Sequence, residues 1–154
     1  MKARVRCISG PNLNRLGTRE PKVYGRITLD EIHRRLEVRG RELGVDVDAR
    51  QTNHEGTMVD WIGESADEGI AGLLLNPGAY THTSIALLDA LYAAALPCVE
   101  VHLSNPDARE AFRRRSWVSR ACKARIAGFG ADSYLLALDG LVRILAAERT
   151  PVPA

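Results

Sequence analysis

Short apolar runs of strand length alternate with amphipathic stretches along the whole chain. The expected strands cover residues 3–9, 45–51, 70–76, 97–103 and 124–129. The stretches between them carry apolar residues at helical spacing, which predicts helices over 28–43, 55–68, 83–96 and 132–148. This alternation is typical of parallel strands joined by crossover helices. Because 154 residues suit a single domain, we expect residues 1–149 to form one domain and residues 150–154 a C-terminal tail.

Two of the expected strands indicate the order of the sheet. Residues 45–51 alternate polar and apolar side chains, as an edge strand does, whereas residues 70–76 are almost wholly apolar, as in a central strand covered on both faces. The economical arrangement is an α/β fold of flavodoxin-like type, a doubly wound open sheet of five parallel strands in three α/β/α layers. Such sheets bind ligands beyond the carboxyl ends of their strands, so we look for the functional site there.

Capping residues mark the ends of two predicted helices. Thr28 is followed three residues later by Glu31, which is the spacing of a capping box, and Gly44 ends the same helix. Thr81 or Thr83 is expected to cap the helix over 83–96.

Composition excludes several classes of protein. A formal net charge of +2 does not favour nucleic-acid binding, and only three of the 21 basic residues are lysines, which favours bidentate anion contacts by arginine over Schiff-base chemistry. The three cysteines lack CxxC spacing and are interpreted as structural thiols, so we expect no metal. The N-terminus has no signal-peptide or membrane-helix pattern, which predicts a cytoplasmic protein without a membrane partner.

Polar side chains gather after three of the expected strands. Asn12, Arg19 and Tyr24 belong to the long loop over residues 10–25, and Asn76 closes the third strand. Glu100 and His102 are two residues apart in the fourth strand, so both side chains leave the same face and Glu100 can orient the imidazole. These strand ends meet at one edge of a parallel sheet, which predicts one shared site.

Phenol, imidazole, amides and arginines together are suited to proton transfer. A tyrosine phenol has a reference pKa of about 10, and a nearby guanidinium favours its ionised form. Arg19 lies five residues from Tyr24 and is the candidate for that cation. A phenolate could remove a proton beside a carbonyl, and the imidazolium of His102 could protonate a departing hydroxyl. This chemistry is a β-elimination of water.

Other interpretations of these residues remain open. A tyrosine in a surface loop is more often a packing residue, His82 could only cap a helix, and the arginines at 113–115 could form a charged surface. The GFGADS segment at 128–133 lacks the third glycine of a dinucleotide-binding fingerprint. A non-catalytic or redox module of flavodoxin type is the alternative, although the first loop offers Gly-Pro-Asn-Leu where flavodoxins have hydroxyl residues.

Several long motifs resemble the type II 3-dehydroquinate dehydratases. They match that family in order and spacing, and they are GPNLNRLGTREPKVYG at 10–25, QTNHEG at 51–56, VDWI at 59–62, NPGAYTHTSIALLDAL at 76–91, EVHLSN at 100–105, AREAFR at 108–113 and GFG at 128–130. The resemblance implies a lyase of the shikimate and quinate pathways that needs no cofactor. It would convert 3-dehydroquinate into 3-dehydroshikimate by trans elimination through an enolate.

The resemblance also implies a role for each matched residue. Tyr24 would be the base, Arg19 its activator on a lid, and Asn12 the holder of a water that stabilises the enolate. His102 would be the acid, oriented by Glu100. The substrate would be bound by Asn76, by the backbone amides of Leu103 and Ser104, and by the side chains of His82 and Arg113.

The family assembles into trimers and dodecamers, so the resemblance implies a homo-oligomer in which Asp89 reaches a neighbour's site. The sequence departs from the common pattern at Trp117 and Arg120, where tyrosine and proline are usual in the family.

Overall fold

Five parallel strands form the centre of the molecule. The computed structural model describes residues 1–18, 22 and 25–150, and its sheet has the order β2-β1-β3-β4-β5. The strands are β1 (Ala3–Ser9), β2 (Val45–Gln51), β3 (Ile70–Asn76), β4 (Cys98–His102) and β5 (Ala124–Ala127). All four neighbouring pairs are parallel, β2 lies at an edge and β3 in the centre. The predicted flavodoxin-like fold is therefore confirmed, including the positions of these two strands.

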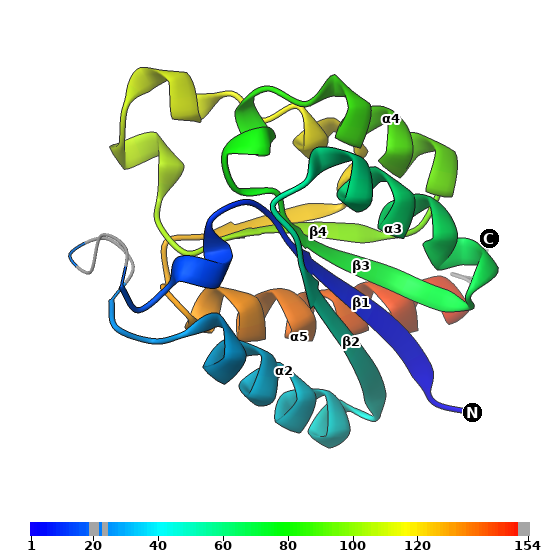
Figure 1. Ribbon diagram of the computed structural model, residues 1–154. Helices are drawn as coiled ribbons and strands as arrows, with labels where there is room; N and C mark the ends of the chain where they lie inside the picture. Colours follow the sequence, from blue (N-terminus) through cyan, green and yellow to red (C-terminus); the bar gives the residue numbers. More distant parts are fainter. Residues whose placement is uncertain (19–21, 23–24, 151–154) are drawn as a thin grey trace.

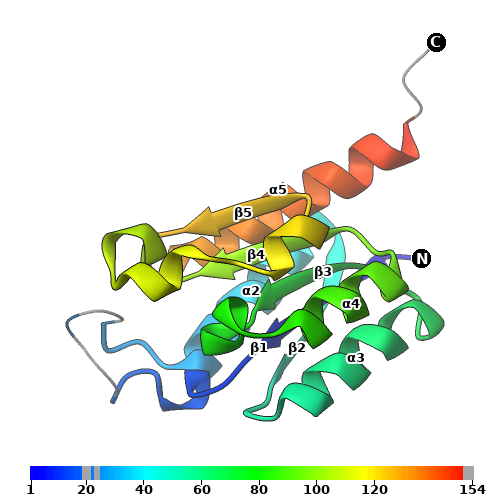
Figure 2. The same ribbon diagram turned by 90° about the horizontal axis from the view of Figure 1, so that it is seen from above.

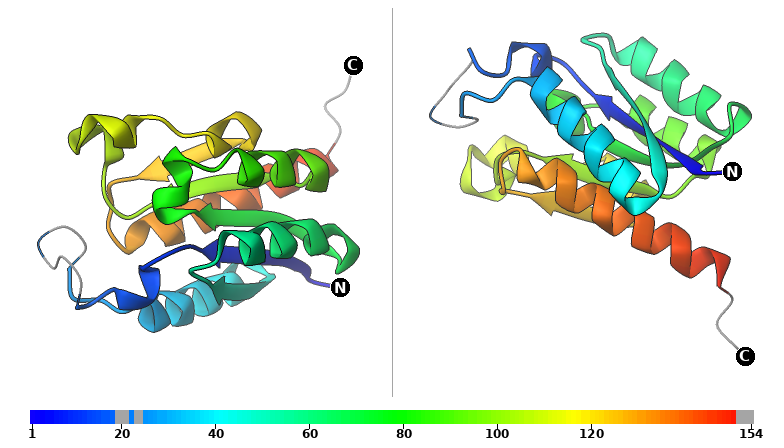
Figure 3. Two further views of the ribbon diagram at one scale, coloured as in Figure 1. Left: turned by 45° about the horizontal axis from the view of Figure 1, so that its top comes forward. Right: turned by 90° about the horizontal axis from the view of Figure 1, so that it is seen from below.

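Two helices cover each face of the sheet (Figures 1 and 2). The helices α2 (Leu29–Leu43) and α5 (Asp132–Arg149) pack on one face, and α3 (Glu55–Asp67) and α4 (Ile85–Ala94) on the other. Figure 3 shows the two faces separately. Each face has its own apolar core, because alternate strand residues point to opposite sides. On β4, for example, Val99 and Val101 belong to the α2/α5 core and Cys98 to the α3/α4 core.

The helix ends follow local capping chemistry, with one correction. Thr28 Oγ1 accepts a hydrogen bond from the Glu31 backbone N–H, and Gly44 ends α2 in the left-handed conformation at φ 78°, both as predicted. The prediction that Thr81 or Thr83 caps α4 was wrong: Ser84 caps it, through a bond from the Leu87 N–H to Ser84 Oγ. The short 3-10 helix Gly78–His82 lies before this point, so the α-helix begins two residues later than expected.

The predicted strand ends differ slightly from the observed ones. The fourth strand is one residue shorter at each end, because Pro97 has no N–H to donate and the carbonyl of Leu103 accepts from Gly130 in a turn. The fifth strand ends at Ala127 because Gly128 turns the chain at φ 94°. Within the described ranges 1–18, 22 and 25–150, no helix is both long and apolar enough to cross a membrane.

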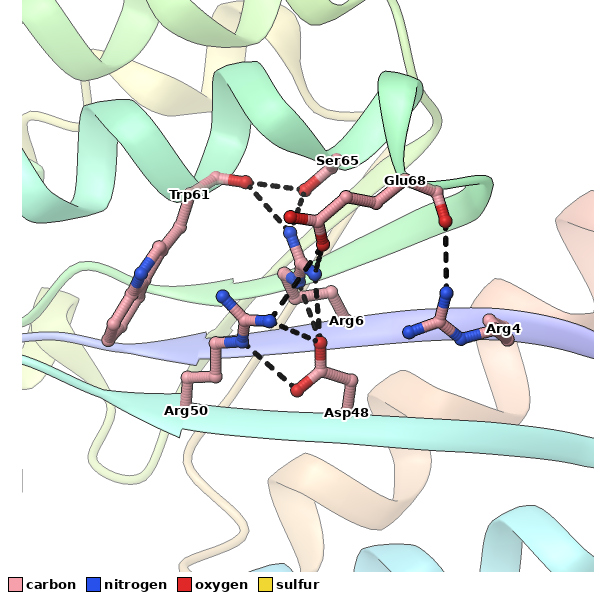
Figure 4. Close-up of polar contacts among 7 residues, drawn as sticks. All are labelled: Arg4, Arg6, Asp48, Arg50, Trp61, Ser65 and Glu68. Atoms are coloured by element: carbon pink, nitrogen blue, oxygen red, sulfur yellow. Dashed lines mark hydrogen bonds and ion pairs between the residues drawn. The ribbon is translucent and has the colours of Figure 1, made fainter.

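A buried arginine fixes α3 to the edge of the sheet (Figure 4). Arg6 on β1 is fully buried, and its guanidinium donates to Asp48 Oδ2 at 2.9 Å, to Ser65 Oγ at 3.1 Å and to the carbonyl of Trp61 at 3.2 Å. It also forms an ion pair with Glu68. A buried cation is tolerated only when its donors are satisfied in this way. The cluster therefore joins β1, β2 and α3 through a single side chain.

Arg6→Met should lower the free energy of unfolding by about 3 kcal/mol, because it leaves carboxylates without their buried partner. Urea denaturation measures this change. Arg34→Met is the matched control: Arg34 is 72% exposed, and its ion pair with Glu31 should contribute less than about 0.5 kcal/mol. Equal effects of the two substitutions would contradict the structural role of Arg6.

Candidate active site

A pocket of about 100 Å³ opens at the carboxyl ends of β1, β3 and β4. These strand ends lie at the left of Figure 1. Most of the predicted site residues line it, namely Asn12, Asn76, His82, His102, Leu103, Ser104 and Arg113. The other lining residues, for which the sequence predicted no role, are Pro11, Leu13, Gly78, Ala79 and Arg109. The structure thus brings together side chains from the first loop, the β3–α4 turn and the segment after β4.

Four predicted residues are not part of the described lining. Glu100 lies behind His102, which it contacts directly. Asp89 is exposed on α4, and a role in a neighbouring subunit's site is not tested by a single chain. Arg19 and Tyr24 lie outside the described residues, so their predicted roles stay predictions.

Glu100 and His102 form a buried pair at the end of β4. Both side chains point to the α3/α4 side of the sheet, as their spacing predicts, and His102 Nε2 contacts Glu100 Oε2. Glu100 is fully buried and His102 is 7% exposed. Since Nε2 faces the carboxylate, Nδ1 is the ring nitrogen left for a ligand. The carboxylate thereby orients the imidazole toward the pocket.

Three further groups hold the Glu100 carboxylate. Ser116 Oγ donates to Oε1 at 2.8 Å, Ser119 Oγ donates to the same oxygen, and Arg125 Nε donates to Oε2 at 3.0 Å. Burial alone would raise the pKa of Glu100. The hydrogen bond and charge of His102, with the two serine hydroxyls, outweigh burial and lower this pKa to about 2. Glu100 is therefore an anion throughout the physiological pH range.

Asn76 is positioned by a tyrosine that the sequence analysis missed. Asn76 Nδ2 donates to the Tyr134 hydroxyl at 3.0 Å, and Asn76 Oδ1 accepts from the Gly78 N–H at 3.1 Å. Tyr134 is fully buried at the start of α5, and its hydroxyl also meets Ser9 Oγ at 2.9 Å. Burial raises the pKa of Tyr134, so this phenol stays neutral and serves as a hydrogen-bond relay. One amide hydrogen of Asn76 Nδ2 then remains for a ligand.

His82 lines the pocket rather than capping a helix. Its Nδ1 lies 2.7 Å from the carbonyl oxygen of Arg115, so Nδ1 carries a proton and donates it. Burial lowers the pKa of His82, and the charges of His102, Arg113 and Arg125 lower it further, against the opposing effect of the Arg115 carbonyl. The neutral ring therefore presents an accepting Nε2, which suits recognition of a hydroxyl group.

Of the three consecutive arginines, only Arg113 lines the pocket. Its Nε donates to Glu110 Oε1 at 3.1 Å, and its guanidinium lies 4.9 Å from the centroid of the Phe112 ring. Arg114 and Arg115 are exposed, as a charged surface would be. Arg114 and Arg115 thus fit the charged-surface interpretation, and the substrate-binding role of Arg113 stays a prediction.

A close approach of two backbone segments shapes the floor of the pocket. Gly10 N–H donates to the Asn76 carbonyl at 2.8 Å. A Cβ at position 10 would lie 2.6 Å from the oxygen of Pro77 and 2.8 Å from its carbonyl carbon. Only glycine fits here, because the conflicting atoms belong to backbone.

Gly10→Ala should therefore separate the Asn12 loop from the Asn76 turn, destabilising the protein by about 2 kcal/mol and lowering kcat/KM at least about tenfold. Thermal unfolding and steady-state kinetics measure these two effects. Gly63 lies at an exposed position of α3, where an added Cβ would meet nothing within 4 Å. Gly63→Ala should instead stabilise the protein slightly. Similar kinetics for the two variants would contradict the close-packing argument.

Comparison with known proteins places the chain in a family. Residues 3–142 match the model of the family described as dehydroquinase class II. A 3-dehydroquinate dehydratase of Rhizobium etli is 56% identical over 90% of this chain and 95% of the relative, and one of Thermus thermophilus is 52% identical over 92% and 95%. The crystal structure of a type II dehydroquinase from Propionibacterium acnes superposes with a TM-score of 0.88 at 46% identity, covering 93% of this chain and 98% of that one.

A flavodoxin-like sheet with a polar pocket at its carboxyl edge places the chain among the α/β enzymes. Within that class, the chain belongs to the class II dehydroquinase family. The resemblance noted in the sequence motifs is confirmed.

Proposed function

We propose that the protein is a lyase of the shikimate pathway that dehydrates 3-dehydroquinate to 3-dehydroshikimate through an enolate, without a cofactor. The single observation that supports this most strongly is the buried Glu100–His102 pair opening into a pocket, in a chain more than half identical to relatives named for that reaction. The pair provides an oriented proton donor at the place where ligands bind in this type of fold.

The reaction needs a proton removed from carbon and a proton given to oxygen. In the proposed first step, the phenolate of Tyr24, activated by Arg19, takes a proton from the carbon beside the substrate's carbonyl. The electron pair moves onto the carbonyl oxygen, and a water held by Asn12 stabilises this enolate. In the second step the carbonyl re-forms, the bond to the departing hydroxyl breaks, and His102 donates the proton that releases water.

The remaining lining groups suit a polyhydroxy acid. Asn76 Nδ2 and the backbone amides of Leu103 and Ser104 would bind the carboxylate. His82 Nε2 and the Arg113 guanidinium would contact the ring hydroxyls. Among the described residues that line the pocket there is no lysine, which is consistent with a route that forms no imine.

We also propose that the chains assemble into trimers and then dodecamers in the cytoplasm. The proposal follows from the family resemblance, in which Asp89, exposed here on α4, would reach the site of a second subunit. Light scattering should give a particle of twelve chains, and a monomer would contradict this part of the proposal.

Addition of 3-dehydroquinate to the purified protein should produce the ultraviolet absorbance of a conjugated enone. Its rate should scale with protein concentration, and substrate without protein provides the control. Copurification of a yellow flavin with no enone formed would contradict the proposal and favour a redox module instead.

A further inference from the structure

We propose that Arg125 is a positioning residue for the dehydration, which shares the Glu100 carboxylate with His102 and so keeps the imidazolium ready to release its proton. This inference rests on the proposed function, in which His102 is the acid. Neither the family motifs nor the pattern of the sequence pointed to Arg125.

The register of the sheet sets Arg125 beside Glu100. The two residues are direct partners on the parallel strands β4 and β5, so their side chains leave the same face. Arg125 Nε lies 3.0 Å from Glu100 Oε2, and His102 Nε2 contacts that same oxygen. The other carboxylate oxygen accepts from Ser116 and Ser119. Glu100 Oε2 thus contacts both Arg125, a permanent cation, and His102, the proposed acid.

The charge balance of this cluster gives Arg125 its effect. With neutral His102, the charges of Glu100 and Arg125 cancel. With protonated His102, the cluster carries one net positive charge in a buried place. Without Arg125, the imidazolium would have the buried carboxylate to itself and would hold its proton more tightly. A general acid that holds its proton too tightly donates it slowly.

The other charged or titratable groups near His102 reach the pocket from other elements. His82 reaches the pocket from the β3–α4 turn, and Arg109 and Arg113 reach it from the segment after β4. In the described part of the chain, Arg125 is the arginine that contacts Glu100. Its side chain is 28% exposed, and its Nη2 atom is buried without a hydrogen-bond partner among the described residues. Because this end of the guanidinium is out of contact with water, solvent screens its charge less than that of a fully exposed arginine.

Arg125→Gln tests the proposal through the pH dependence of kcat. The variant loses the permanent cation, so the acid should stay protonated to higher pH. We expect the alkaline limb of the kcat profile to move up by about one pH unit. At neutral pH, kcat should fall about threefold because the acid is weaker, while KM stays within about twofold. Arg125→Lys restores a positive charge and should return the limb toward its wild-type position.

Two control variants distinguish the effect of the Arg125 charge from the effect of losing a hydrogen bond to Glu100. Lys123→Gln removes a neighbouring cation that is 58% exposed and pairs with Glu148, away from the pocket, and it should leave the profile unchanged. Ser119→Ala removes a neutral hydrogen bond to Glu100 and no charge, so it should move the alkaline limb much less than Arg125→Gln does.

An unmoved limb in folded Arg125→Gln would overturn the proposal, as would an equal shift in Lys123→Gln. If Arg125→Gln does not fold, Arg125→Met, which keeps the packing of the stem, replaces it. Failure of both to fold would assign Arg125 to stability and also overturn the proposal. The proposed function has its own separate test. An active His102→Ala variant would refute the acid role of His102 and with it the proposed mechanism. An inactive His102→Ala variant together with an unmoved Arg125→Gln profile would reject only the role of Arg125.

Discussion

Tyr24→Phe is expected to lower kcat for dehydration by about a thousandfold while the protein remains folded. The substitution removes only the phenolic oxygen, which the proposed mechanism uses to take a proton from carbon. A phenylalanine ring fills nearly the same volume, so KM should change by only a few-fold. Steady-state kinetics measured by enone absorbance, with circular dichroism as a check of folding, gives both values.

The matched control for this experiment is Tyr92→Phe. Tyr92 lies on α4 with 56% of its surface exposed, and it does not line the pocket. Its hydroxyl should have no effect on kcat. A Tyr24→Phe variant with near wild-type kcat would refute the assigned base, whatever the behaviour of the control.

His102→Ala should also lower kcat by about a thousandfold and raise KM much less. The departing hydroxyl would then leave without a proton, while Asn76 and His82 continue to bind the substrate. His102→Gln sharpens the test, because its side-chain N–H can still donate to Glu100 but cannot supply an acidic proton. If the hydrogen bond to Glu100 were the only role of His102, the glutamine variant would recover activity, and we expect that it does not.

His54→Ala is the control for a histidine removed elsewhere. His54 is exposed before α3 and does not line the pocket, so the kinetics should be unchanged. Equal losses in kcat/KM and in substrate affinity for His102→Ala would indicate a binding role for His102 instead of an acid role.

Much of this architecture could be predicted from local patterns. The period-two spacing of Glu100 and His102 was sufficient to place both on one face, and the apolar run ending at Asn76 located the central strand. These features follow from the geometry of one strand. The parallel sheet then brings the strand ends to one edge, which is why distant motifs could be assigned to one site.

Other features depend on contacts that no local pattern specifies. Arg125 meets Glu100 through the register of two strands that are separated in sequence by a long segment. Ser116 and Ser119 come from that segment, whose course between β4 and β5 has no periodicity to predict it. The α4 cap was missed because Thr81, Thr83 and Ser84 are all suitable capping residues, and the preceding 3-10 helix selects the last of them.

Tyr134 is the site residue whose position could most readily have been predicted from the sequence. It stands at the start of the last helix, just after the glycines at 128 and 130, and therefore at the carboxyl edge of the sheet. A polar aromatic residue there can reach the end of the central strand, and Tyr134 does so through Asn76. Its position could have been inferred, whereas its partner could not.

In the proposed mechanism, the pocket at the carboxyl ends of β1, β3 and β4 binds the reacting acid between a phenol and an imidazole. A crystal structure with 3-dehydroshikimate bound tests this directly. We predict the carboxylate of the ligand on Asn76 Nδ2 and the amides of Leu103 and Ser104, with the Tyr24 oxygen facing the carbon that loses its proton. A ligand bound elsewhere, or a Tyr24 oxygen turned away from that carbon, would contradict the account.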